Sequence, residues 1–399
     1  MPLSLSGNGT ITGNVSFANS VTLSTVTATT VSANSINSSS YVSANSHVIT
    51  GINYALGPQT MKNRIINGDM RIDQRFNGAA NNNFNGSQYV IDRWYQFGMV
   101  TGRIRCQQNN TNGPGQTATQ TATGFANYFG ANTVVANSSY GASDAYYFTQ
   151  PIEGLNTADL NWGTASASPV TLSFWVYSST SGTHSGSVSN GYTTRSYPFS
   201  YTINTANTWQ FQTITIPGDT TGSWWSNNNT GMYVIYNLGA GSTYTSSSPN
   251  SWQTGYYQSV TGAVNPQSLA NGAFYLTGVQ LEKGTQATSF DWRHYTTELQ
   301  LCQRYYETGG EVNGEVQWSG NATSGATYYA TVYFKVTKRI ASTITTTNQN
   351  NYGFSSTAST AYDANSVSGF RLGRVSNSSV NGGYFGDTWT ASAELGVQN

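Results

Sequence analysis

The sequence predicts an all-β protein with an N-terminal β-repeat shaft or extended arm, a central jelly-roll β-sandwich, one short helix and a small C-terminal β domain. Two observations predict the β class. One is a short apolar repeat near the N-terminus, and the other is a series of runs rich in Val, Ile, Tyr, Phe and Trp, separated by Gly, Asn and Ser. The 399 residues are enough for two or three domains of roughly 150 residues.

The first part, residues 1–60, is defined by its repeat. The sequence VSANS at 31–35 returns at 42–46, and from residue 21 an apolar or aromatic residue recurs every five positions. One such ribbon cannot bury its own apolar stripe. We therefore expect this segment to wind with copies of itself in a homotrimer, or to lie against a neighbouring subunit as an attachment arm. A flexible Ser/Thr linker is the alternative.

The second part, residues 61–294, has the pattern of a jelly roll. Its runs alternate polar and apolar residues, which is typical of half-buried antiparallel strands. Many such strands, joined by loops without long helices, predict a β-sandwich, and the jelly roll is its commonest form at this size. The clearest expected strands are 145–152, 169–177, 208–216, 232–238 and 273–281.

One helix and a last β domain follow. The helix is predicted from Tyr295 to Tyr306, because Tyr295, Leu299, Cys302 and Tyr306 fall on one helical face before Gly309 and Gly310. We assign 295–307 to this connector helix and 308–399 to a C-terminal β domain. The strands expected in that domain are 328–336, 369–375 and 383–394.

Composition excludes several classes of protein. Sixteen basic residues balance sixteen acidic ones without any basic run, so we expect no nucleic-acid partner. The first thirty residues lack a signal-peptide pattern, and no stretch approaches the about 20 apolar residues of a membrane span. Cys106 and Cys302 are too few for a disulfide framework. An uncharged polar surface without an export signal fits a protein released by lysis, such as part of a virus particle.

Titratable side chains give no catalytic signature. His47, His184 and His294 lie far apart in the sequence, and no metal-ligand spacing occurs, so we expect no catalytic residues, metal or cofactor. The charges of one region predict a structural cluster instead. We expect its arginines to lower the pKa values of its acids, which would spoil a glycosidase's general acid. The cluster consists of Asp69, Arg71, Asp73, Arg75, Asp92 and Arg93.

Aromatic residues in loops point to sugar binding. Flat rings beside Asn, Gln and Asp suit the C–H face and the hydroxyls of a pyranose. The candidate carbohydrate-binding residues are Trp224, Trp225, Trp252, Tyr256 and Tyr257. The alternative is that Trp224 or Trp225 packs over the sandwich edge or into a neighbouring subunit. On strands, by contrast, Phe174, Trp175 and Trp209 are expected in the core.

Four motifs resemble a known family. They are NRIINGDMRIDQR at 63–75, DRW at 92–94, FYLTGVQLEKG at 274–284 and LCQRYY at 301–306. Together they resemble bacteriophage tail-fibre and related virion fibre proteins. The resemblance implies a jelly roll similar to carbohydrate-binding modules, followed by a small terminal β domain. It carries no catalytic residues.

The resemblance also implies a function and partners. We expect a structural fibre protein of a bacteriophage particle that recognises host-surface glycan. It would be made in the bacterial cytoplasm and joined to other virion proteins through its N-terminal segment. The alternative is an architectural protein that decorates the capsid or tail without a receptor role. A polysaccharide-degrading enzyme is a less favoured third class.

Overall fold

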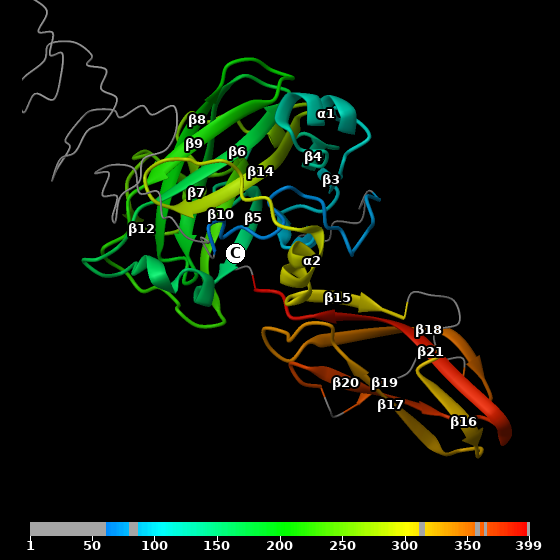
Figure 1. The fold of residues 1–399 in the computed structure, drawn as a ribbon. Helices are drawn as coiled ribbons and strands as arrows, with labels where there is room; N and C mark the ends of the chain where they lie inside the picture. The colour runs from blue at the N-terminus through cyan, green and yellow to red at the C-terminus, as the bar shows by residue number, and fades with distance from the viewer. Residues whose placement is uncertain (1–60, 80–86, 311–315, 356–359, 363–364, 397–399) are drawn as a thin grey trace, which may run out of the picture. The chain divides into compact units, whose positions relative to one another are not determined.

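A computed structural model describes residues 61–79, 87–310, 316–355, 360–362 and 365–396 (Figure 1). These residues confirm the all-β prediction, because antiparallel sheets dominate and only two α-helices occur among them. The expected N-terminal shaft and its homotrimer lie outside the described residues and stay predictions. No described helix is long and apolar enough to cross a membrane.

Two sheets make the jelly-roll sandwich, and the chain passes repeatedly from one to the other. The larger sheet, in spatial order, contains β1 (Ser87–Ile91), β2 (Trp94–Gly98), β5 (Ala145–Glu153), β10 (Thr230–Ala240), β7 (Gly182–Asn190), β8 (Arg195–Ile203) and β12 (Gln253–Thr254). The smaller contains β3 (Ile104–Gln108), β4 (Phe129–Thr133), β14 (Ala273–Lys283), β6 (Val170–Ser178) and β9 (Gln210–Ile216). A two-residue parallel pair, β11 (Thr245–Ser246) with β13 (Ser259–Val260), lies beside them.

The core follows from the period of two along each strand. In β10, Met232, Val234 and Tyr236 point into the main core, while Tyr233 and Ile235 point to the opposite face. The same alternation in β5, β6 and β14 places large apolar side chains from both sheets between them. The sandwich interior is therefore a single apolar layer.

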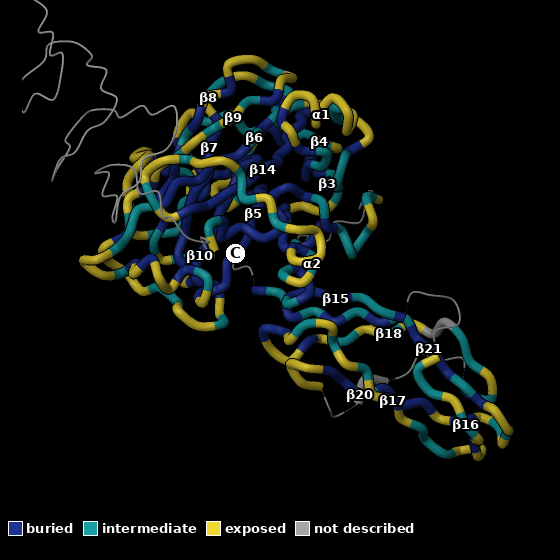
Figure 2. Tube along the Cα trace, in the orientation of Figure 1, coloured by how far each residue is buried: buried dark blue, intermediate teal, exposed yellow. Residues whose placement is uncertain are grey.

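The central strands are more buried than their pattern predicts. We expected half-buried strands, yet β5 and β10 are buried at every position (Figure 2). The reason is that aromatic clusters cover both outer faces. Tyr147 and Tyr233 belong to the cluster on the larger sheet, and Tyr128 and Tyr275 to that on the smaller.

The sequence missed one helix and misjudged the length of another. Helix α1 (Gln116–Thr123) has a Thr-rich sequence without apolar periodicity. Its buried residues are Thr119 and Thr123, the Thr121 and Thr123 hydroxyls donate to carbonyls one turn back, and Gly124 ends the helix at φ +85°. The expected 295–306 helix is α2 (Tyr295–Gln303), which ends earlier because Tyr306 begins a strand.

The C-terminal residues form two further sheets around a separate apolar cluster. Strand β21 (Val380–Ser392) pairs with β15 (Tyr306–Gly309), β16 (Trp318–Ala322) and β18 (Thr343–Tyr352). Strand β20 (Gly369–Val375) pairs with β17 (Thr327–Tyr333) and β19 (Thr360–Tyr362). Phe370, Phe385 and Trp389 lie in the cluster. The three strands expected here all form, with shifted ends.

The motif stretches meet one another in space. Arg64 donates its backbone N–H to Leu281 (3.0 Å), and Val279 donates to the Gly68 carbonyl (2.9 Å). The Asn63 side chain bonds the backbone of both Val279 and Leu281. The indole N–H of Trp94 in the DRW motif donates to Asn67 (2.9 Å). The motifs are thus one hydrogen-bonded structural unit at the sandwich.

The LCQRYY motif at 301–306 connects the sandwich to the C-terminal sheets. The buried Arg93 ion-pairs with Glu394 and lies over the Tyr305 ring, 3.6 Å from its centroid. Arg75 binds the same carboxylate at 2.7 Å. Arg304 makes a bidentate pair with Glu153 at 2.9 and 2.7 Å. Buried, paired charges therefore fasten the segment after β21 to the sandwich.

We predict that Gly68→Ala destabilises the protein by about 3 kcal/mol, since a Cβ there would lie 2.2 Å from the Val279 carbonyl oxygen. The matched control is Gly115→Ala, where no atom lies within 4 Å and φ is −60°; its change should stay within about 1 kcal/mol. Denaturant unfolding measures both. Equal stability of the two variants would contradict the tight approach of the two motif stretches.

We predict that Glu394→Gln lowers the free energy of unfolding by about 3–5 kcal/mol, because Arg93 would stay buried without its counter-charge. Lys283→Gln is the control, since this lysine is 45% exposed and lies 3.7 Å from its acid. That change should cost no more than about 1 kcal/mol. If urea denaturation found the same small loss for both, the Glu394 pair would not fasten the C-terminal segment.

Candidate functional site

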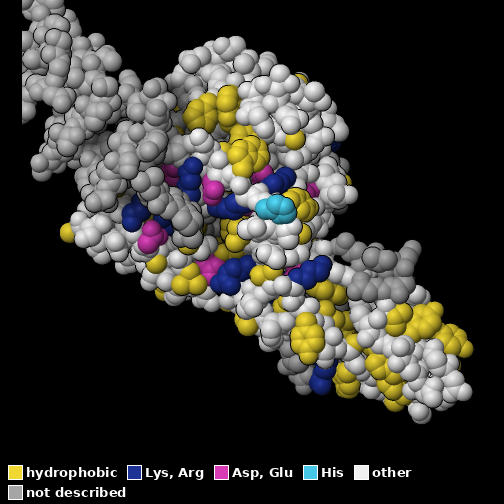
Figure 3. All heavy atoms as spheres, in the orientation of Figure 1, with side chains coloured by type: hydrophobic (Ala, Val, Ile, Leu, Met, Phe, Trp, Pro, Cys, Tyr) yellow, Lys and Arg dark blue, Asp and Glu magenta, His cyan; other side chains and the backbone are white. Residues whose placement is uncertain are grey.

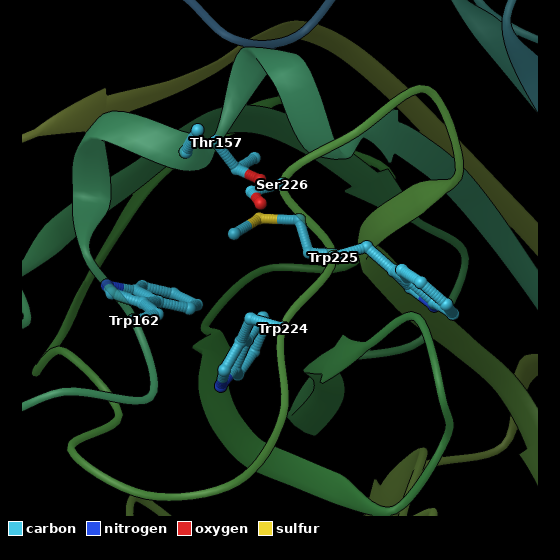
Figure 4. Close-up of a pocket in the computed structure, with 7 residues that line it drawn as sticks. Thr157, Trp162, Trp224, Trp225 and Ser226 are labelled. Carbon is cyan, nitrogen blue, oxygen red and sulfur yellow. The ribbon is translucent and has the colours of Figure 1, made fainter.

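A hollow with an open volume of about 280 Å³ lies between the loop after β5 and the loop before β10. Its wall contains three tryptophans, Trp162, Trp224 and Trp225, with two hydroxyls, Thr157 and Ser226. Figure 4 shows Trp162 and Trp224 close to each other, while the Trp225 ring points away from them. Ala158 and Met232 complete the lining, so the hollow has aromatic, aliphatic and hydroxyl groups but no charged one.

A buried ion pair shapes the loop that carries Trp224. Asp219 is 1% exposed and binds Arg195 through two contacts, at 3.0 and 2.7 Å. Its backbone carbonyl accepts the Gly163 N–H at 2.7 Å, which draws the loop of Trp162 to the same place. The Trp224 indole N–H donates to the Asp219 carboxylate at 3.3 Å. These contacts of Asp219 therefore fix the shape of the hollow.

Three tryptophans pack edge to face. Trp162 lies 4.7 Å from Trp224 and 5.3 Å from Trp252, measured between ring centroids, with near-perpendicular planes. The Trp252 indole N–H donates to the Pro217 carbonyl at 2.7 Å. Trp224 and Trp252 both pack against the main core. Trp224 and Trp252 therefore pack at the sandwich edge, a position that the alternative interpretation expected for Trp224 or Trp225.

Trp225 differs because its partner is at the surface. Its ring stacks on Tyr192 with centroids 4.5 Å apart and planes 19° apart. Trp225 is half-buried, and Tyr192 is 38% exposed in the turn between β7 and β8. A Cβ on Gly191 would lie 2.9 Å from the Trp225 ring, so this glycine lets the ring approach the turn. The pair forms a fixed aromatic platform beside the hollow.

The structure separates the remaining candidates from the hollow. Tyr256 packs on the outer aromatic cluster, with its hydroxyl 3.5 Å from that of Tyr147. Tyr257 is half-buried, and its backbone N–H donates to Ser196. Neither lines the hollow. Sequence reasoning also missed two contributors, Trp162 and Tyr192, which lie in loops distant in sequence from the Trp224 loop and carry no local signal of their own.

Only some residues of the expected charge cluster pair with one another. Arg71 binds Asp69 at 3.0 Å, but Arg75 and Arg93 bind Glu394 instead. The carboxylate of Asp73 accepts backbone N–H groups of residues 75, 76 and 78 and so forms a turn. Asp92 accepts two bonds from Gln74. The cluster therefore holds the backbone and the C-terminal segment.

The expectation that arginines lower the pKa of the acids is wrong for Asp69. Desolvation by burial outweighs Arg71 and raises its pKa from 3.8 to about 6. Burial does the same for Asp92, against the effects of Arg75 and Gln74. A carboxyl with this pKa has the protonation range of a general acid. The hollow beside Asp69 has almost no space for a water-sized group, however, so it cannot hold a sugar ring.

The histidines and cysteines show no catalytic arrangement. His184 is buried against Tyr201 with its ring nitrogen 3.0 Å from the Thr180 carbonyl, and burial lowers its pKa. His294 caps α2, and His47 lies outside the described residues. Cys106 and Cys302 are buried free thiols. In the described part of the chain, no three His, Cys, Asp or Glu residues are grouped to hold a metal ion.

Comparisons with known proteins give only distant structural likeness. No protein-family model matches the sequence, and no curated protein matches it. One similar structure is the enzymatically active domain of tailspike protein 4 of bacteriophage CBA120, at 13% identity and a TM-score of 0.28 over 56% of this chain; the match spans 22% of the tailspike chain. At this TM-score the likeness decides nothing about function.

Sugar-binding modules are also among the similar structures. The module TmCBM61, solved with β-1,4-galactotriose, is 10% identical at a TM-score of 0.25, over 48% of this chain and 88% of the module. A family 11 carbohydrate-binding module from Clostridium thermocellum, solved with a mixed-linked tetrasaccharide, is 11% identical at a TM-score of 0.24, over 51% and 98%. Here too the low TM-scores leave the function to be inferred from this chain's own residues.

We predict an unusual pH dependence from Asp69. Its folded-state pKa lies above the unfolded value, so unfolding releases a proton between about pH 4 and 6 and the free energy of unfolding falls as pH rises through that window. Asp69→Asn removes this fall. The stability of the wild type relative to the variant should decrease by on the order of 2–3 kcal/mol from pH 4 to pH 7.

Asp159→Asn is the control for this titration. Desolvation raises the pKa of Asp159, but Arg64 and Lys283 outweigh it and lower the pKa overall. The stability that this carboxylate contributes is therefore present above its unfolded pKa and lost as pH falls, which gives the opposite slope. Denaturant unfolding at four or five pH values measures both differences. The same slope for the two variants would contradict the burial of Asp69.

Proposed function

We propose that this chain is a non-enzymatic, glycan-binding fibre component of a bacteriophage particle, and that a saccharide ring lies against Trp225 with one substituent in the small hollow beside Trp224. The observation that carries the proposal is the stacked Trp225–Tyr192 pair beside a hollow lined by hydroxyl and apolar groups. A pyranose presents an apolar C–H face to such a ring and hydroxyls to Thr157 and Ser226.

The absence of charge in the lining indicates the class of sugar. Asp219, which accepts the Trp224 indole N–H, is neutralised by Arg195. A neutral hexose or N-acetylhexosamine therefore suits this site better than a charged one. The space for water-sized groups inside the hollow is only about 40 Å³, far below the about 300–1,000 Å³ of ligand sites, so the hollow admits a single substituent of a sugar and not its ring.

Binding at one such site is expected to be weak. A shallow site with few buried hydrogen bonds supports millimolar affinity, about −4 kcal/mol. A fibre compensates for this by carrying several copies, which can raise the apparent affinity by roughly 10² or more. The proposed oligomer and the proposed sugar site are therefore linked, because each copy contributes little by itself.

The virion setting rests on the motif resemblance and on the composition. The visible surface supports it: Figure 3 shows charged side chains gathered in a band near α2 and β15, with mostly uncharged groups elsewhere on that face. One observation favours the architectural alternative. The motifs that carry the resemblance form internal contacts, such as Arg64 with Leu281, and so explain the fold without a receptor site.

We predict that Trp225→Ala reduces binding of the purified chain to host surface polysaccharide at least about tenfold. Its unfolding temperature should fall by only a few degrees, because the ring lies outside the main core. Trp292→Ala is the matched control, since Trp292 is 59% exposed and lies away from the hollow. Binding can be measured on immobilised polysaccharide. Undiminished binding by folded Trp225→Ala would refute the site, and release of cleaved sugar chains would refute the non-enzymatic role.

A further inference from the structure

The C-terminal sheets contain a second and larger opening. A groove with about 370 Å³ of space for water-sized groups lies between β15 and β17, a size within the range of about 300–1,000 Å³ for ligand sites. Thr308 on β15 and Thr331 on β17 line it with hydroxyls. Both strands are pairing edges in the described part of the chain, since β15 pairs only with β21 and β17 only with β20.

Two aromatic side chains have different roles in this groove. Trp389 is 6% exposed and packs on Phe370 at 5.3 Å between centroids, so it forms a fixed wall. Gly309 makes this wall possible, because a Cβ there would lie 2.3 Å from the Trp389 ring. Tyr333 is 77% exposed and stands opposite Gly369 in the sheet, which leaves its ring open to a ligand.

Among the described residues, one cation of the groove has no carboxylate partner. Glu307 lines the groove but is ion-paired with Lys338, and both side chains are fully buried. Glu307 also accepts the backbone N–H of Lys335 at 3.1 Å. The Lys335 side chain is exposed, and among the described residues no carboxylate lies within 4.0 Å of its ammonium. The described lining therefore presents one exposed ammonium, that of Lys335.

We propose that this groove is a second saccharide site, selective for an acidic sugar whose carboxylate pairs with Lys335 while its ring lies against Tyr333. The site differs from the neutral hollow in residues and in charge, so it extends the proposed function without depending on it. A fixed indole wall, an open phenol ring, two hydroxyls and one exposed ammonium are the groups that a uronic or sialic acid residue would engage.

The test compares ligands that differ only in charge. Oligogalacturonate and its methyl ester have the same rings and linkages, and sialyllactose and lactose provide a second acidic and neutral pair. Calorimetric titration of the full chain should give at least about tenfold tighter binding of one acidic ligand than of its neutral counterpart. This difference should shrink as salt screens the exposed ion pair. Equal affinity within both pairs, or no binding of either acidic ligand at about 10 mM, overturns the proposal.

Substitutions test whether the preference for the acidic ligand comes from the groove. Lys335→Gln should bring the affinity for the acidic ligand down to that for the neutral one, and Tyr333→Ala should weaken both. The controls are Lys62→Gln, which removes an equal charge elsewhere, and Tyr352→Ala, which removes a tyrosine that is 53% exposed and outside the groove. Trp225→Ala should leave acidic binding unchanged, so failure of one site is distinguishable from failure of the other. Unaltered selectivity in folded Lys335→Gln overturns the proposal.

Discussion

The buried contact of Arg93 with Glu394 is the interaction on which the arrangement of the described chain depends. Only 8% of the residues are charged, and a large part of that small number is used internally. Glu394 holds Arg75 and Arg93, Glu153 holds Arg304, and Asp387 holds Arg374. A buried charge is destabilising without its counter-charge, so each pair fixes which two segments of the chain lie together. Solubility is left to Asn, Ser, Thr and Gln, whose amides and hydroxyls also suit contact with sugars.

Much of the fold could be predicted from the sequence, because period-two alternation survives wherever apolar residues fill one face. The five strands expected in the sandwich all formed within about two residues of their predicted ends. Strand β7 was not singled out, since Ser185, Ser187 and Ser189, on the outer face of its sheet, are fully buried without being apolar. Helix α1 was missed for a related reason: its buried residues are Thr119 and Thr123, so its sequence has no apolar period.

The candidate site was predictable only in part. Trp224 and Trp225 were identified from their loop, and both line the hollow. Trp162 and Tyr192 could not be found this way, because the contacts that place each of them beside the Trp224 loop depend on Asp219, Arg195 and a glycine turn distant in sequence. The pKa of Asp69 shows the same limit. Neighbouring arginines are visible in the sequence, whereas the burial that outweighs them is a property of the folded chain.

The position of β21 has a consequence for how the protein is made. This strand lies at the centre of its sheet and pairs with β15, β16 and β18, all of which precede it in the chain. On the ribosome, the sandwich can therefore form from residues already synthesised, since domains generally fold as units during synthesis. The C-terminal sheets must wait for β21 to emerge, and the Arg93 guanidinium must wait longer still for Glu394. Until Glu394 is synthesised, the Arg93 guanidinium has no counter-charge, and the surface of the sandwich around it stays exposed to water.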